Sequence, residues 1–87
     1  MCTYLTETIK IAGSGKGSKG WFAVSDASVY FDHPVHAMAE HTLNIDFRNP
    51  GQGPDARVAV ELTAESAREL VRAIEATLAS APPGMVA

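Results

Sequence analysis

Three histidines, the only ones in the chain, fall within nine residues at positions 33, 36 and 41. Imidazole titrates near neutral pH and is the commonest protein ligand for transition metals. His33 and His36 are separated by two residues, one of them a proline, and this spacing can bring two imidazoles to one ion. We therefore expect the chemistry of the protein in residues 33–41, either at a metal or by proton transfer.

A divalent transition metal is the first interpretation of this cluster. We predict that His33, His36 and His41 bind it, with Cys2 or an acidic neighbour completing the set. Zinc is favoured because a nitrogen-rich site with a thiolate is typical of it, while copper and nickel stay open. With three protein ligands the metal could activate water. With four ligands the metal would be structural, or the protein would be a metal carrier.

Two other functions are compatible with the same residues. The protein could be a metal-free enzyme in which a histidine is the general base and Cys2 or a carboxylate lies beside it. It could also be a dimeric module that binds a partner protein through an uncovered sheet face. The histidines match no zinc-finger spacing, and a loop in which they are purely structural is a further alternative. The sequence leaves open whether the protein is an enzyme.

Glycines are concentrated between residues 13 and 20. Gly15, Gly17 and Gly20 satisfy a literal G-x-G-x-x-G, the phosphate-binding pattern of dinucleotide-binding folds. That pattern requires a helix after the loop, because the helix N-terminus holds the phosphates. Here the strand-like residues 21–24 follow instead. We therefore reject a nucleotide site and expect a flexible connection between strands.

Alternating apolar and polar residues predict the strands that position the histidines. The alternation changes parity near Ser25 and Asp26, which indicates a bulge or turn that divides the second strand. His41 opens the third strand on its apolar parity and so points to the apolar side of the sheet. Strands are expected over residues 4–12, 21–31, 41–47 and 58–62.

A helix is predicted after the last strand. Thr63 is a good N-cap, and apolar residues recur at spacings of three and four until the helix ends near Ser80. The predicted fold class is α+β: an antiparallel sheet of three to five strands followed by one C-terminal amphipathic helix packed on one face. Residues 1–80 form a single domain, and residues 81–87 form a flexible C-terminal tail.

Composition and charge restrict the partners. The chain of 87 residues has a formal charge of −3 and only seven basic residues, most of them well separated, which argues against nucleic acid. The chain contains no run of about 18 apolar residues, the length that a membrane span requires. It also shows no secretory signal pattern. We therefore expect a cytoplasmic protein. The aromatic residues exceed what one helix covers. We therefore expect a homodimer that binds a metal ion or a small molecule.

A Met-Cys-Thr-Tyr start, a Gly-Ser-Gly-Lys-Gly loop at residues 13–17 and an Asp-His-Pro-Val-His block at residues 32–36 occur together in this chain. In this combination the chain resembles a family of small uncharacterised bacterial proteins of actinobacterial type. The resemblance covers nearly the whole chain and implies a free-standing protein of about this length. It implies no activity.

Overall fold

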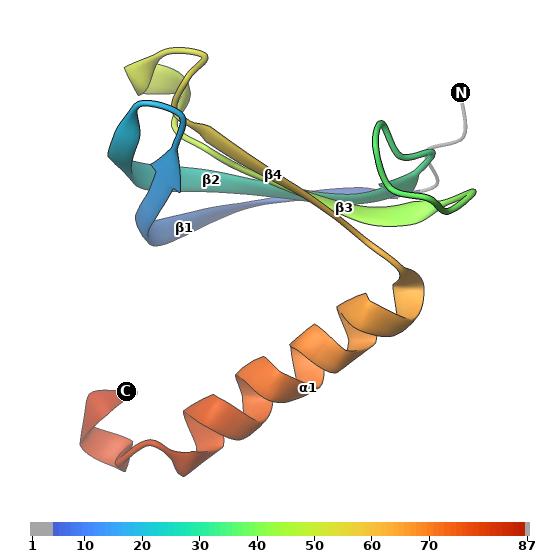
Figure 1. The fold of residues 1–87 in the computed structure, drawn as a ribbon. Coiled ribbons are helices and arrows are strands. Elements are labelled where there is room, and N and C mark those ends of the chain that lie inside the picture. Colours follow the sequence, from blue (N-terminus) through green and yellow to red (C-terminus); the bar gives the residue numbers. More distant parts are fainter. Residues whose placement is uncertain (1–4, 87) are drawn as a thin grey trace.

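The computed structural model describes residues 5–86. They form a four-stranded antiparallel sheet in the order β1-β2-β3-β4, followed by one long helix, so the predicted α+β arrangement is confirmed (Figure 1). Two 3-10 turns complete the description, η1 (Pro50–Gln52) and η2 (Pro83–Met85), the second within the predicted tail. The main elements are β1 (Thr6–Gly17), β2 (Gly20–Asp32), β3 (Thr42–Arg48), β4 (Arg57–Leu62) and α1 (Ala64–Ser80).

The strand register separates polar from apolar side chains onto two faces of the sheet. Side chains alternate between faces along each strand, so cross-strand partners share one face. We call one side the polar face; it carries the rows Ser28–Asp46–Ala59 and Tyr30–Asn44–Glu61. We call the other side the apolar face; it carries the rows Val29–Ile45–Val60 and Phe31–Leu43–Leu62.

The glycine-rich segment is part of a hairpin, and the expectation of a flexible connection is wrong. β1 continues to Gly17, which pairs with Gly20, and only residues 18 and 19 form the turn. Gly20 has a φ of 106°, a value that favours glycine. In this hairpin the Val24 side chain of β2 lies close to the β1 backbone at Gly15. A Cβ added to Gly15 would lie 3.1 Å from Cγ2 of Val24. Glycine at position 15 therefore avoids a tight contact with Val24.

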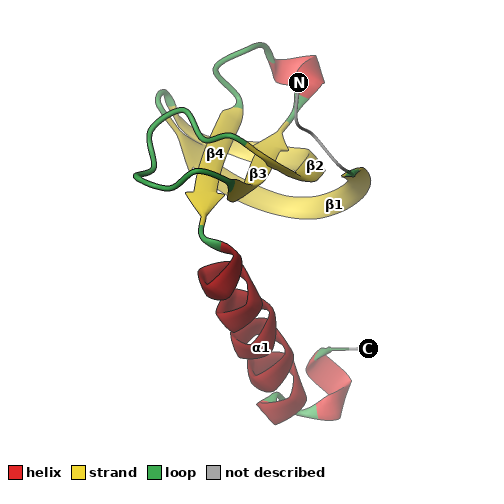
Figure 2. Cartoon of the chain, turned by 90° about the vertical axis from the view of Figure 1, so that its right-hand side faces the viewer, coloured by secondary structure: helices red, strands yellow, loops and turns green. Residues whose placement is uncertain are grey.

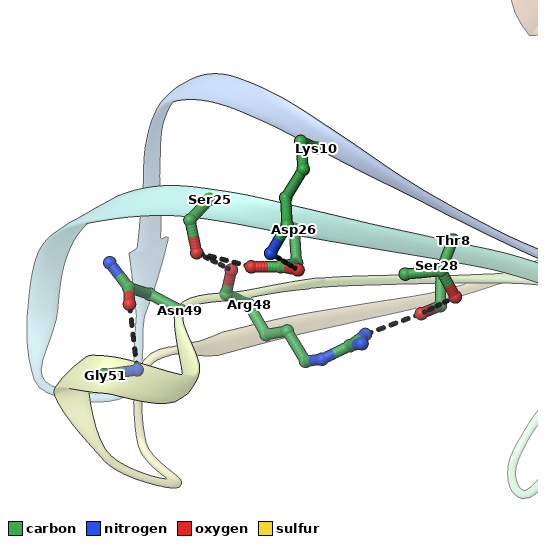
Figure 3. Close-up of polar contacts among 8 residues, drawn as sticks. All are labelled: Thr8, Lys10, Ser25, Asp26, Ser28, Arg48, Asn49 and Gly51. Atoms are coloured by element: carbon green, nitrogen blue, oxygen red, sulfur yellow. Dashed lines mark hydrogen bonds and ion pairs between the residues drawn. The ribbon is translucent and has the colours of Figure 1, made fainter.

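The second strand is not divided as expected, although the predicted irregularity is present in the strand pairing opposite Ser25. β2 is continuous, and the irregularity lies in its partner β1, where the register shifts between Lys10 and Gly13. The polar side chains opposite this bulge are bonded to one another (Figure 3). Lys10 Nζ donates to Asp26 Oδ2 at 2.7 Å, and Ser25 Oγ donates to Asp26 Oδ1 at 2.6 Å. Asp26, which interrupts the apolar pattern of β2, is thus a buried carboxylate with two hydrogen-bond donors.

Helix α1 extends away from the sheet (Figure 2). Its N-cap Thr63 accepts the backbone N–H of Ser66 at 3.1 Å, as predicted from the sequence. Only its first turns meet the apolar face, where Ala64 and Ala67 border a hollow with Phe31 and Leu43. The predicted packing on one face is therefore limited to these turns, and the rest of the apolar stripe is exposed.

Few apolar side chains are buried in the described part of the chain: Val24, Ala27 and Ala56. Polar side chains are buried beside them, and Thr42, the most buried, donates from Oγ1 to Asn44 Oδ1 at 2.7 Å. The small apolar core follows from a single sheet that α1 covers only at its first turns. Within residues 5–86, no helix has the length and apolar character needed to cross a bilayer.

Candidate functional site

The loop of residues 33–41, here the histidine loop, connects β2 to β3 and lies against Glu61 on the polar face. The Glu61 carboxylate accepts three consecutive backbone N–H groups, from Val35 at 2.5 Å, from His36 at 3.0 Å and from Ala37 at 2.9 Å. These donors hold the pKa of Glu61 below its usual range, because they stabilise the ionised form. Glu61 therefore stays charged and ties the loop to β4.

Two of the three histidines are in ring contact. The ring centroids of His33 and His41 lie 4.4 Å apart, and the ring of His41 stacks on Phe31 at 5.7 Å. Phe31 is on the apolar face, so the predicted orientation of His41 agrees with the structure. His33 Nδ1 lies 2.9 Å from the carbonyl oxygen of Glu40. A carbonyl oxygen only accepts, so Nδ1 carries the proton and a neutral His33 has its lone pair on Nε2.

The third predicted ligand of this loop, His36, is bonded to the sheet through its backbone. Its backbone N–H is bonded to Glu61, and its exposed side chain borders a cavity on the polar face. Within residues 5–86, no group of three or more His, Cys, Asp or Glu side chains has an arrangement that could hold a metal ion. The fourth predicted ligand, Cys2, lies outside the described residues.

A cavity of about 780 Å³ lies between the polar face and the histidine loop. This volume is within the range of small-molecule sites, roughly 300–1,000 Å³. β2, β3 and β4 contribute mainly polar and charged side chains, and the loop contributes two of the histidines. The polar lining consists of Tyr30, Asp32, His33, His36, Asn44, Asp46, Arg57 and Glu61.

Asp46, on β3, is held in the cavity wall by two neighbouring side chains. Arg57 donates to Asp46 Oδ1 at 2.7 Å, and the Tyr30 hydroxyl donates to Asp46 Oδ2 at 3.4 Å. The Asp46 side chain is 17% exposed and that of Arg57 is 54% exposed. Burial of the hydroxyl and the nearby Asp46 charge raise the pKa of Tyr30, because both disfavour the phenolate. Tyr30 thus remains a hydrogen-bond donor at neutral pH.

The comparison with protein families covers the whole chain. A family model described as a family of unknown function, DUF6295, matches residues 1–87. The chain belongs to this family. No curated protein and no solved structure matches it. The resemblance to an uncharacterised family is therefore confirmed, and membership of DUF6295 assigns no site residue.

Five polar cavity residues of this DUF6295 member were not singled out by the sequence analysis: Tyr30, Asn44, Asp46, Arg57 and Glu61. One signal was present, because Asn44 and Asp46 occupy the polar parity of the third predicted strand. Polar parity alone predicts a solvent-facing surface. The histidine loop turns part of that surface into a cavity, and this depends on the contact between Glu61 and residues 35–37.

Proposed function

We propose that the protein binds a small cationic organic molecule, such as a compound with an amine or guanidinium group, in the cavity of the polar face. The charge of the lining carries this proposal. Three carboxylates, those of Asp32, Asp46 and Glu61, border the cavity together with one guanidinium, that of Arg57. If the Asp32 carboxylate is left out of this comparison, the two carboxylates of Asp46 and Glu61 still outnumber the single guanidinium. A partly enclosed surface with excess negative charge attracts cations.

The arrangement of Asp46 supports the same ligand class. Its carboxylate is mostly buried and already has two donors, so its position is defined before a ligand arrives. Preorganised polar groups reduce the entropy lost on binding. Asn44 and Tyr30 add neutral hydrogen-bonding groups to the lining, and Ala59 and Val35 add apolar surface. This mixture is suited to an organic cation with a polar head and a short apolar part.

His33 adds a group that can accept a proton from such a ligand. It borders the same cavity, and its protonated Nδ1 leaves Nε2 basic. An imidazole with one nitrogen fixed by a backbone carbonyl is oriented for proton transfer at the other. This supports the interpretation of the protein as a metal-free enzyme, with His33 as the base and carboxylates nearby.

Titration calorimetry with matched small molecules tests the proposal. Amines and guanidines should bind, and carboxylates and phosphates of similar size should not. Asp46→Asn should weaken the binding of the cation about tenfold or more, equivalent to about 1.4 kcal/mol. Glu75→Gln, on α1 and away from the cavity, removes the same charge and should leave binding unchanged. Preferential binding of anions, or equal binding by Asp46→Asn and the wild type, would exclude the proposal.

A divalent transition metal, with zinc favoured, is a second candidate ligand. One observation supports it: His33 donates from Nδ1 to a backbone carbonyl, an arrangement common among metal-binding histidines. The proposed ligands are His33, His36, His41 and Cys2. Metal analysis of untagged protein should find stoichiometric metal that is lost when the three histidines are replaced by alanine. Metal-free protein whose melting temperature does not change on addition of zinc would exclude this function.

A further inference from the structure

We propose that the protein is a homodimer in which α1 of each copy packs against the apolar face of the other copy. The proposal concerns the side of the sheet opposite the cavity and does not depend on what the cavity binds. It rests on the exposed area, on the position of the exposed apolar side chains, and on the fit of a second copy to both uncovered surfaces.

The chain exposes more surface than a compact monomer of its mass. Its accessible surface is 6404 Å² at 9.2 kDa, whereas a compact folded chain of this mass exposes about 4,900 Å². Its radius of gyration is 14.5 Å, against about 12 Å for a compact domain of this length. The excess of about 1,500 Å² exceeds the roughly 800 Å² that each partner buries in a standard interface. One chain can therefore supply its half of a stable dimer.

Part of this excess is an apolar stripe on α1. The stripe begins at Ala67, which borders Phe31 and Leu43 of the apolar face. It continues on the same side of the helix at spacings of three and four. Each of its four larger side chains is about half exposed: Leu70 43%, Val71 53%, Ile74 50% and Leu78 55%. The stripe and the apolar face thus meet at the start of the helix, and both are open beyond it.

The helix needs a covering partner to be stable. Helix α1 has 17 residues, and most of the stability of such helices in proteins comes from packing of their apolar side. The ion pair between Glu69 and Arg72 contributes only a few tenths of a kcal/mol at most, because both side chains are exposed. Burial of the stripe is therefore the main source of stability available to α1.

A second copy of the chain fits both open surfaces. Each copy offers a helix stripe and an apolar sheet face, so a two-fold axis pairs each stripe with the other copy's sheet. The sheet side includes Ile9, which shares a row with Ala27 and Phe47 and is 50% exposed. The opposite side of α1 carries charges of both signs, so the helix presents a mixed-charge surface to solvent: Glu65, Glu69, Arg72 and Glu75.

Sedimentation of the full-length protein tests the dimer, and two substitutions locate the interface. Ile74→Asp places a charge in the stripe and should shift the protein to monomer at micromolar concentration. The control Ala76→Asp adds the same charge about 160° from Ile74 around the helix axis and should remain dimeric. Ile9→Asp, on the sheet side, should also weaken the dimer at least tenfold. Because Ile9 is exposed, this variant tests the interface even where Ile74→Asp fails to fold.

Three results would overturn the proposal. The first is a monomeric wild type whose melting temperature is independent of concentration, which would mean that the helix closes on its own sheet. The second is a dimer that Ile74→Asp leaves unchanged. The third is a dimer lost in Ile74→Asp and unaffected by Ile9→Asp, which would limit the contact to the helices. A wild-type dimer whose melting temperature rises with concentration is the supporting result.

Discussion

The carboxylate of Glu61 accepts the backbone N–H of Val35 at 2.5 Å, although the two residues are 26 positions apart in the chain. The N–H groups of His36 and Ala37 are bonded to the same side chain. One carboxylate therefore determines where the histidine loop lies on the sheet. This contact joins two parts of the cavity wall, since the loop and β4 both border the cavity.

Replacement of Glu61 by glutamine should loosen the histidine loop. Glutamine retains one acceptor oxygen but loses the charge that strengthens the three bonds. We expect faster hydrogen exchange at the amides of Val35, His36 and Ala37, and a lower melting temperature. Glu75→Gln, which removes a charge from α1, is the control and should change neither. Unaltered exchange of the three loop amides in Glu61→Gln would show that the carboxylate does not hold the loop.

Stability should decrease at acid pH, in part through Glu61. Its pKa is lowered by the backbone N–H groups of Val35, Ala37 and His36, so the unfolded chain takes up the proton at a higher pH than the folded chain. The stabilisation is complete above the ordinary pKa of the carboxyl and is lost as the pH falls through the lowered value. Asp26 acts in the same direction, because Lys10 and Ser25 lower its pKa.

Calorimetric melting between neutral and acid pH measures this dependence. Glu61→Gln should show a smaller decrease in melting temperature than the wild type, and the remaining decrease should include the contribution of Asp26. The same acid dependence in both proteins would contradict the role given to Glu61.

Gly17 and Gly13 should respond differently to the same substitution. A Cβ on Gly17 would lie 3.0 Å from the carbonyl oxygen of Asp55 and 3.3 Å from the ring of Phe22, whereas a Cβ on Gly13 meets no atom within 4 Å. We expect Gly17→Ala to lower the free energy of unfolding by about 1–3 kcal/mol, as measured by urea denaturation. Gly13→Ala is the matched control and should be neutral or slightly stabilising. Equal stability of the two variants would contradict the close approach at Gly17.

Tyr30 should ionise above the usual pH range of tyrosine. Burial is the largest cause of its raised pKa, and the charge of Asp46 raises the pKa further. In an ultraviolet titration Asp46→Asn should lower this pKa without restoring the ordinary value, because the burial remains. The chain has one other tyrosine, which also contributes to the titration. The part of the signal that is lost in Tyr30→Phe therefore belongs to Tyr30. A Tyr30 pKa that is equal in the wild type and Asp46→Asn would show that the carboxylate has no influence on the hydroxyl.

Much of the fold follows from local patterns in the sequence. Alternation predicted β3 and β4 to within a residue, because each strand has one apolar and one polar side. Thr63 and the apolar spacing predicted α1 from its cap to Ser80. Both patterns depend on neighbouring residues and do not require knowledge of distant contacts. The same reasoning failed at residues 13–20, where pairing with β2 overrides the flexibility of glycine.

By itself, the sequence determined an antiparallel sheet of three to five strands, the helix after it and the segment that carries all three histidines. Only the tertiary structure decided that His33 meets His41, that His36 lies with Glu61 on the polar face, and that Tyr30, Asp46 and Arg57 share a cavity. It also decided that α1 leaves the sheet and keeps its apolar stripe exposed. The physical reason is that periodicity specifies which side of an element is apolar. The surface that covers this side depends on contacts between residues far apart in the chain, or between two chains.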